Sequence, residues 1–252
     1  MDFLFKAACV CHRGNIRSTN EDNFYFDGKH MEMEHGNLSH PVCMEGNLTE
    51  RKFLAVFDGM GGENFGERAS FEAAHAVQKS LQDNMYLRGE KDQLKLLVEE
   101  MNKSVVHAQE ELLTSYMGTT LVSLYFTAQN VYVCNLGDSR AFRLRNQALE
   151  QLSRDHVDHR PLKPGRKPAL SQYIGMGSEE MQLSPYIAMG KLELGDKYLL
   201  CSDGLTDMVS NFEIADILIR STNVMEAAEA LLQAALEAGG QDNITVIVSS
   251  IC

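Results

Sequence analysis

Short apolar runs alternate with longer polar stretches along the chain, and they predict most of its strands. The runs are rich in β-branched or aromatic residues and span residues 3–12, 52–57, 118–127, 130–136, 139–144, 196–202 and 243–251. Apolar segments of this length, bounded by polar residues, are typical of β-strands. The pattern therefore predicts a protein with a large β component.

Two stretches between residues 64 and 115 have a helical period instead. Apolar residues recur there at three- and four-residue spacing, first as Phe71, Ala74, Val77 and Leu81, then as Leu94, Leu97, Met101, Val105, Ala108 and Leu112. This spacing places each set on one face of a helix. We therefore expect two consecutive amphipathic helices.

Two more helices are predicted near the C-terminus. Ser210 followed by Glu213 resembles a capping box, which opens a helix by satisfying its first backbone N–H groups. A further helix over about 223–238 ends at the pair Gly239 and Gly240, since glycine favours the backbone conformation that ends helices. Both signals indicate short helices close to the last strand.

The order of these elements favours an α+β fold. Strands come in runs and helices in pairs, which is typical of layered folds with mostly antiparallel sheets. No repeat or flexible linker divides the chain, so residues 1–252 are expected to form a single domain. Residues 28–50 and 153–184 are polar and aperiodic, and we expect both to be surface loops of functional interest.

Charge and composition exclude several classes of function. The chain has 23 Lys plus Arg against 35 Asp plus Glu, a net charge of −12, which disfavours nucleic acid as a partner. No leader-like segment and no apolar run of about 18 residues is present, so a cytoplasmic protein without a membrane span is expected. The six cysteines lie mostly in apolar runs, which favours buried, reduced thiols over disulfides.

Acidic residues stand where several predicted strands begin or end. Asp58-Gly59 and Asp203-Gly204 each follow a strand, Asp242 precedes one, and Asn20-Glu21-Asp22-Asn23 precedes the run at 24–26. A single Asp-Gly pair is more often an ordinary turn, but four such segments together are harder to explain that way. Carboxylate and carbonyl oxygens suit Mg²⁺ or Mn²⁺ rather than zinc. The pattern therefore favours a site for hard divalent cations.

At these positions the chain resembles the PPM (protein phosphatase 2C) class of metal-dependent serine/threonine phosphatases. The matching stretches are GNIRSTNEDN from residue 14, FLAVFDGMGG from 53, GTTLVSLYF from 118, VCNLGDSRAFRL from 133, YLLCSDGLTD from 198 and GGQDNITVIV from 239. They extend over almost the whole chain. The resemblance implies a central sandwich of two antiparallel β-sheets flanked by pairs of α-helices, with two Mn²⁺ or Mg²⁺ ions at one end.

The same resemblance implies which residues hold the two ions. Asp58 is similar to the carboxylate that bridges both, and Gly59 to the residue whose backbone carbonyl binds one of them. Glu21 would complete the protein ligands of that ion. Asp203 and Asp242 would hold the other ion.

Three further roles follow from the resemblance. Arg17 would bind the substrate phosphate, for which a planar guanidinium fork is well suited. Asp22 would orient the attacking water. Asp138 would help Asp203 bind a weaker third metal, or would be a turn acid between two strands. Water would attack phosphorus directly, without a covalent phosphoenzyme.

The chain departs from the family pattern at two places. Many members carry histidine where this chain has Met60, so the proton donor to the leaving oxygen is unassigned; nearby His12 is one alternative, a plain surface histidine the other. The loop after Leu152 lacks the usual family sequence. Its basic residues Lys163, Arg166 and Lys167 could contact an acidic or phosphorylated peptide, or could simply be solvated.

Two rival functions remain open from the sequence. Cys11 and Arg17 have the spacing of cysteine-dependent phosphatases, although the segment that follows them is predicted as turn and strand rather than helix. A binding module that has lost catalysis is the other rival, but the metal acids are all retained. The expected protein is thus a monomeric phosphatase of the bacterial stand-alone type, whose partners are phosphorylated proteins, including a Ser/Thr kinase or its substrates.

Overall fold

Two antiparallel sheets form the centre of the computed structural model, which describes residues 3–60, 65–82, 89–114, 116–158, 160, 167–177 and 182–252. The first sheet has the strand order β3 (Val42–Asn47), β1 (Leu4–His12), β12 (Ile244–Ile251), β11 (Lys197–Cys201), β8 (Arg140–Arg145) and β9 (Ala148–Gln151). The second has the order β10 (Tyr186–Lys191), β7 (Asn130–Leu136), β6 (Leu121–Phe126), β4 (Lys52–Met60) and β2 (Asp22–Phe26), and the short β5 (Gly118–Thr119) pairs with β4.

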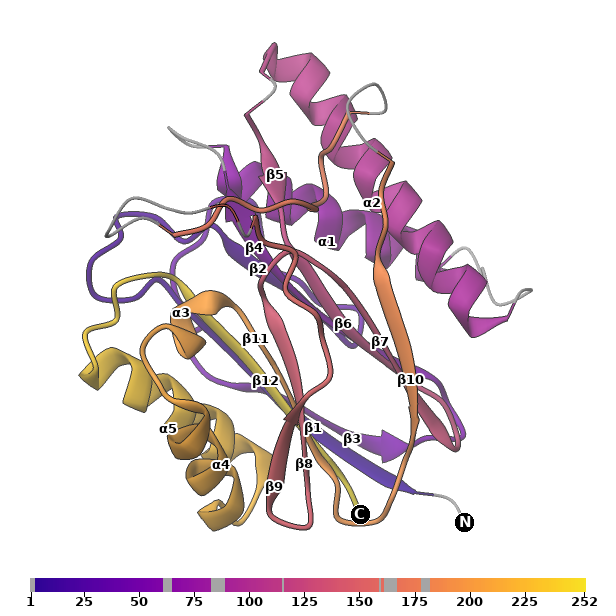
Figure 1. Cartoon of the computed structure of the whole chain (residues 1–252), viewed down its shortest axis with the longest axis vertical. Coiled ribbons are helices and arrows are strands. Elements are labelled where there is room, and N and C mark those ends of the chain that lie inside the picture. The colour runs from indigo at the N-terminus through magenta and orange to yellow at the C-terminus, as the bar shows by residue number, and fades with distance from the viewer. Residues whose placement is uncertain are drawn as a thin grey trace.

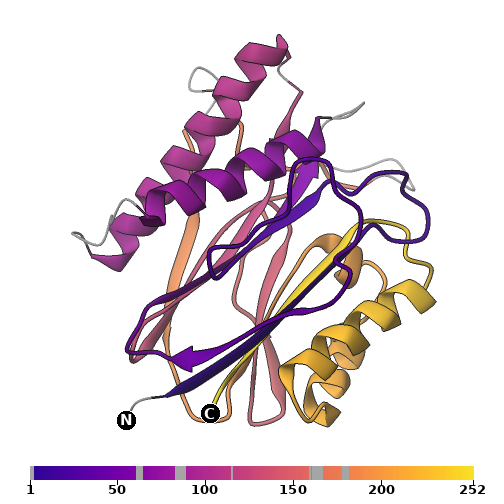
Figure 2. The ribbon, with the colours of Figure 1, turned by 180° about the vertical axis from the view of Figure 1, so that it is seen from behind.

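Helices cover the outer faces of both sheets (Figure 1). Helices α1 (Gly66–Gln82) and α2 (Glu90–Leu112) pack on the second sheet, and α4 (Asn211–Arg220) and α5 (Val224–Glu237) on the first. The view from behind shows the same order of layers (Figure 2). The short helix α3 (Asp203–Thr206) directly follows β11. The predicted α+β sandwich flanked by helix pairs is therefore confirmed.

A hydrophobic layer between the two sheets holds them together. Phe5 and Tyr198 of the first sheet and Phe24 and Phe126 of the second are all buried in one cluster. The ring centroids of Phe5 and Phe126 lie 4.8 Å apart, and those of Phe126 and Tyr198 lie 5.4 Å apart. Burial of such large rings supplies much of the hydrophobic free energy of folding. Both sheets thus share one core.

The two chain ends also meet within the first sheet. The backbone N–H of Leu4 donates to the carbonyl of Cys252 at 2.9 Å, and the N–H of Cys252 donates back to Leu4 at 2.8 Å. His12, at the other end of β1, pairs with Ile244 at the start of β12. The two ends of the described chain therefore lie together at one end of the β1–β12 pair.

The helix signals read from the sequence are confirmed in detail. The Ser210 hydroxyl accepts from the N–H of Glu213, and the Glu213 carboxylate accepts from the N–H of Ser210, which completes the capping box of α4. Helix α5 ends before Gly239 and Gly240, whose φ angles are +128° and +54°. These positive values favour glycine.

The expectation that residues 28–50 form only a surface loop is wrong. Val42–Asn47 form β3, which pairs with β1 at the edge of the first sheet. Only one face of this strand is half-buried and the other is exposed, so its hydrophobic signal is weak. In the described part of 153–184, the pairing consists of isolated bridges only: Val157 with Leu170, and Ile174 with Thr119.

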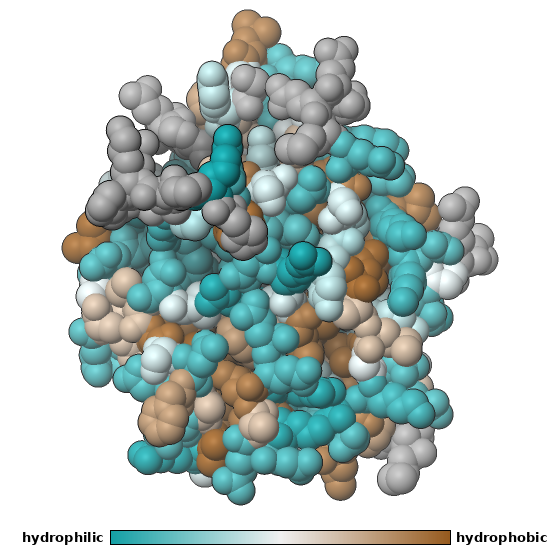
Figure 3. Space-filling view, in the orientation of Figure 1, coloured by the Kyte–Doolittle hydropathy of each residue, from teal (hydrophilic) through white to brown (hydrophobic). Residues whose placement is uncertain are grey.

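Cysteine burial follows the prediction in part. Four of the cysteines are buried, whereas Cys43 on β3 and Cys252 are exposed, and all six are free thiols. None of the helices in the described ranges is long and apolar enough to cross a membrane. Figure 3 shows hydrophilic residues over most of one face of the molecule, with hydrophobic residues scattered among them.

Candidate metal centre

Acidic residues from distant segments converge at one end of the sandwich. Asp58 near the end of β4 lies directly opposite Asp22 at the start of β2. Asp203 follows β11 and Asp242 precedes β12. Because these strands are antiparallel neighbours, both residues lie at the same end of the strand pair. Asp138, Asp203 and Asp242 are all close enough to Asp58 to raise its pKa. The structure therefore brings these five acids together.

The backbone of Asp58 and Gly59 is held by neighbouring strands. The Thr120 hydroxyl accepts from the Asp58 N–H at 3.0 Å, and the Thr120 N–H donates to the Asp58 carbonyl at 2.9 Å. The N–H of Gly59 donates to the carbonyl of Glu21 at 3.1 Å. A Cβ atom at Gly59 would lie 2.1 Å from the carbonyl oxygen of Gly66, a clash that leaves room only for glycine. This close approach places Glu21 beside Asp58.

Asn243 fixes the loop that carries Arg17 and Glu21. Its side-chain oxygen accepts from the Glu21 N–H at 2.8 Å, and its amide nitrogen donates to the carbonyls of Arg13 and Thr19, each at 2.9 Å. The residue is buried. The sequence analysis missed this role of Asn243. The signal in the sequence was the polar pair Asp242-Asn243 directly before an apolar strand.

Asp22 is almost fully buried, and only one of its two carboxylate oxygens has a hydrogen-bond partner among the described residues. The Ser202 hydroxyl donates to Asp22 Oδ2 at 2.7 Å and in turn accepts from the N–H of Thr245 at 3.0 Å. The other oxygen, Oδ1, is buried without a hydrogen-bond partner among the described residues. Burial raises the pKa of Asp22 to about 7. An unpaired buried carboxylate oxygen of this kind is costly unless a cation or water meets it.

The other acids also have raised pKa values. Burial, with Glu67 as the next cause, raises the pKa of Glu21 to about 7, and burial together with Asp203 raises the pKa of Asp138 to about 6. Burial and the neighbouring carboxylates raise the pKa of Asp58 well above its usual range. The cluster therefore holds more negative charge than its surroundings stabilise, and a divalent cation would reverse this imbalance.

The donor atoms fit hard divalent cations. The cluster offers carboxylate oxygens and one closely packed glycine backbone, and such ligands suit Mg²⁺ or Mn²⁺. In the ranges that the structure describes, no three His, Cys, Asp or Glu side chains form a group that could hold a metal ion as they stand. Two of the carboxylates instead contact cations of the chain itself.

Arg17 and Lys167 are these two internal cations. Arg17 Nη2 lies 2.7 Å from Asp242 Oδ2. Lys167 Nζ lies 2.6 Å from Asp203 Oδ2 and 2.5 Å from Asp207 Oδ2. Arg17 lies at the cluster, as the sequence analysis expected. For Lys167 that analysis left a peptide contact or a solvated side chain open, and it did not foresee the contact with Asp203. Lys163 and Arg166, the other members of that basic patch, lie outside the described residues.

The geometry favours neither of two alternatives from the sequence, His12 as the proton donor and Cys11 as the nucleophile. The N–H of Gly14 donates to His12 Nδ1 at 2.9 Å, and burial lowers the pKa of His12, which favours the neutral ring over a proton-donating one. Cys11 is buried within β1, and burial raises the pKa of its thiol to about 12. A nucleophilic cysteine needs a lowered pKa and access to substrate. Met60, half-buried at the end of β4, pairs with Gly118.

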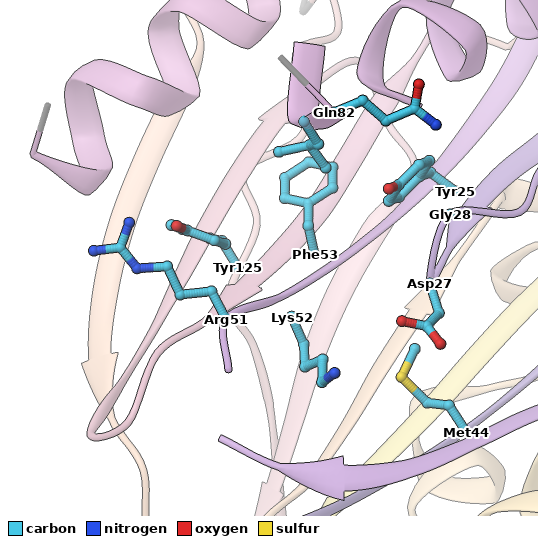
Figure 4. A pocket seen from close by; sticks show the side chains of 10 residues that line it. Tyr25, Asp27, Gly28, Met44, Arg51, Lys52, Phe53, Gln82 and Tyr125 are labelled. Carbon is cyan, nitrogen blue, oxygen red and sulfur yellow. The ribbon is translucent and has the colours of Figure 1, made fainter. Parts of the chain in front are cut away.

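A separate cavity of about 210 Å³ lies at the other end of β4. Tyr25, Arg51, Lys52 and Phe53 contribute to its walls (Figure 4). Phe53 precedes Asp58 by five residues, which is about 16 Å along a strand. The cavity is therefore distinct from the acidic cluster.

Comparisons with known proteins identify the family of the chain. A family model described as protein phosphatase 2C matches residues 45–238. A serine/threonine phosphatase, Stp, of Listeria welshimeri is 32% identical, with 94% of this chain and 92% of that protein covered. The serine/threonine protein phosphatase PstP of Mycobacterium tuberculosis is 31% identical over 98% of this chain, which spans 45% of that protein.

Solved structures show the same arrangement of layers. The crystal structure of Mycobacterium tuberculosis PstP superposes with a TM-score of 0.78 at 28% identity, and 98% of each chain is covered. A catalytic domain of PstP in complex with two manganese ions gives a TM-score of 0.77 at 29% identity, and 99% of each chain is covered.

Proposed function

The chain belongs to the protein phosphatase 2C family, and we propose that it is a metal-dependent phosphatase that hydrolyses phosphoserine and phosphothreonine in proteins. The observation that carries this proposal is the convergence of Asp22, Asp58, Asp203 and Asp242 at one end of the sandwich. The similar proteins named above are serine/threonine phosphatases, and one related structure holds two manganese ions. Activity rather than mere binding is favoured because these acids are retained.

The ligands of the two cations are assigned as follows in this proposal. Asp58 would serve both cations, the Gly59 carbonyl and Glu21 would serve one, and Asp203 and Asp242 would serve the other. Divalent cations in such a site lower the pKa of water toward neutrality and offset charge on phosphoryl oxygens. The raised pKa values of Glu21 and Asp58 support the assignment, because burial and neighbouring carboxylates disfavour their charged forms where no cation is present.

Arg17 and Asp22 act on substrate and water. The Arg17 side chain is 53% exposed, so its guanidinium can donate two hydrogen bonds to a phosphate dianion while Asp242 holds it in place. Asp22, with one oxygen fixed by Ser202 and the other unpaired, orients water for attack on phosphorus. Because water is the nucleophile and the Cys11 thiol is buried, no phosphoenzyme forms.

A weaker third cation at Asp138 and Asp203 is part of the proposal. The closeness of these two acids supports it, since Asp203 raises the pKa of Asp138. Mn²⁺ and Mg²⁺ both suit the oxygen donors. We further propose that residues 1–252 act as one domain in the cytoplasm, as a monomer, and that the substrates are proteins modified by a Ser/Thr kinase.

Hydrolysis assays test the proposed function directly. Protein stripped of metal should hydrolyse p-nitrophenyl phosphate and a phosphothreonine peptide only after Mn²⁺ or Mg²⁺ is added. EDTA should abolish the activity, whereas iodoacetamide should leave it unchanged because Cys11 is buried. Loss of activity with iodoacetamide but not with EDTA would favour the thiol mechanism. Well-folded protein that binds Mn²⁺ but turns over neither substrate would be the binding module instead.

A further inference from the structure

Lys167 forms an ion pair with two acids at the candidate metal centre. Its ammonium nitrogen lies 2.6 Å from Asp203 Oδ2 and 2.5 Å from Asp207 Oδ2. The Asp203 side chain is 16% exposed, so this contact is partly shielded from water. Although burial opposes the charged form of Lys167, the two carboxylates raise its pKa overall. The lysine is therefore a firmly charged cation at this position.

Backbone pairing on the C-terminal side of Lys167 fixes its position. Leu170 pairs with Val157, the Asp158 N–H donates to the Ala169 carbonyl at 2.8 Å, and the Ser171 N–H donates to the His156 carbonyl at 2.9 Å. We call these contacts between 156–158 and 169–171 the flap ladder. The ladder is joined to the sandwich, because the His156 N–H donates to the carbonyl of Gly137 at 2.9 Å. Lys167 thus lies two residues from a fixed ladder, and it is close enough to Asp138 to lower the pKa of that acid.

Lys167 contacts a carboxylate that the proposed function assigns to a divalent cation. A cation coordinated by Asp203 would lie within a few ångströms of the Lys167 ammonium, and two positive charges this close repel each other strongly in a partly buried site. The neighbouring acid shows a parallel arrangement, since Asp242 is paired with Arg17 at 2.7 Å. Both acids assigned to the second cation are therefore neutralised by the chain itself.

We propose that Lys167 is a built-in competitor for the second divalent cation: it neutralises Asp203 and Asp207 while that cation is absent, and it must leave Asp203 when the cation binds. This inference rests on the proposed function, because it needs Asp203 to be a metal ligand. Its consequence is that cation occupancy and the position of the flap ladder are coupled. In the opposite role, Lys167 would orient Asp203 and assist cation binding. The two roles predict changes of opposite sign in cation affinity when Lys167 is replaced.

Calorimetric titration of the metal-stripped full chain with Mn²⁺ separates these roles. Lys167→Gln should bind the second Mn²⁺ about twofold to fivefold more tightly than the unchanged protein, as expected for loss of one partly exposed ion pair. Lys167→Arg, which keeps the charge, should behave like the unchanged protein. Lys103→Gln is the matched control, because Lys103 forms a comparable surface ion pair with Glu100 on α2.

Hydrogen exchange gives a second readout that does not depend on activity. Adding Mn²⁺ should speed exchange at the amides of Asp158 and Ser171 in the unchanged protein, because release of Lys167 loosens the flap ladder. In Lys167→Gln these amides should exchange fast with or without Mn²⁺.

The outcomes distinguish the two proposals. Unchanged or weaker Mn²⁺ affinity in Lys167→Gln, while the unchanged protein binds two ions and hydrolyses phosphate esters, overturns the role of Lys167 and leaves the proposed function intact. If the unchanged protein binds no Mn²⁺, both proposals fail together.

Discussion

Asp22 lies directly opposite Asp58 across the β2–β4 strand pair, so two carboxyl groups face each other on the same side of the sheet. Like charges in such a position destabilise an antiparallel pair. Both groups have raised pKa values, and burial is the largest cause for each. The facing acids therefore lower the stability of the metal-free fold.

Replacing Asp58 separates its effect on activity from its effect on stability. Asp58→Asn should lower Mn²⁺-dependent hydrolysis by more than about 100-fold. This loss exceeds the largest one usual for a residue that only hydrogen-bonds to a metal ligand. The metal-free variant should melt at a higher temperature than the unchanged protein, because one of two facing carboxylates is gone. Activity assays and thermal melts in EDTA check the two effects. A variant that keeps its activity would remove Asp58 from the metal centre.

The stability of the metal-free protein should fall as pH rises. The pKa of Asp22 and of Glu21 is raised to about 7, and that of Asp138 to about 6, above the values near 4 of an unfolded chain. Their contribution to stability is fully present below pH 4 and is lost as pH rises through 6 and 7, because the folded protein then loses protons at a cost.

Calorimetric melts in EDTA at pH 6 and pH 8 check this dependence. The melting temperature should be higher at pH 6, and Asp22→Asn should narrow the difference. Mn²⁺ affinity should change in the opposite direction and rise from pH 6 to pH 8, because cation binding releases these protons. If the unchanged protein and Asp22→Asn, both free of metal, were each more stable at pH 8 than at pH 6, the raised pKa values would be contradicted.

Arg17 should matter for its shape as well as its charge. Arg17→Ala should lower kcat/KM for a phosphopeptide by about 100-fold, and Arg17→Lys should recover only part of this loss, because an ammonium group cannot make the two-point contact with phosphate. Inhibition by inorganic phosphate should weaken in parallel. Arg13→Ala is the matched control, since Arg13 instead donates to the carbonyl of Ser18. Equal losses for Arg13→Ala would point to loop stability rather than phosphate binding.

A histidine at position 60 should help only substrates whose leaving group needs a proton. Met60→His should raise kcat for a phosphoserine peptide by about 100-fold, the low end of the usual range for general acid catalysis. The kcat for p-nitrophenyl phosphate should stay nearly constant, because p-nitrophenolate leaves without a proton. Met60→Leu keeps an apolar side chain and should change neither rate. Equal increases for both substrates would exclude proton donation as the cause.

The interior of the fold could be predicted from the sequence, but most of its edges could not. Central strands such as β12 are buried on both faces, and α1 and α2 carry long apolar periods, so their signals are strong. The strands β3, β9 and β10 were missed, and each is an edge strand of its sheet. An edge strand has a partner on one side only and is partly exposed, which leaves a short and mixed pattern.

The candidate site could be predicted to the level of its acids. Asp58, Asp203 and Asp242 stand at strand ends beside glycine or asparagine, and the structure brings them together as expected. The contacts of Lys167 with Asp203 and of Ser202 with Asp22 join residues far apart in the sequence. No local pattern encodes such contacts, because they depend on how the loops are placed by the finished sandwich.

The meeting of Leu4 and Cys252 in adjacent strands has a practical consequence for engineering this protein. Strand β1 has nine residues, so Leu4 and the neighbouring Cys252, which we call the seam, lie roughly 27 Å from His12 at the usual rise per residue of a strand. Fluorophores or purification tags attached there would stand well clear of the acids. A short linker across the seam would permit circular permutation, with new ends opened in an exposed turn such as Asn146-Gln147 while the acidic end of the molecule keeps its connections.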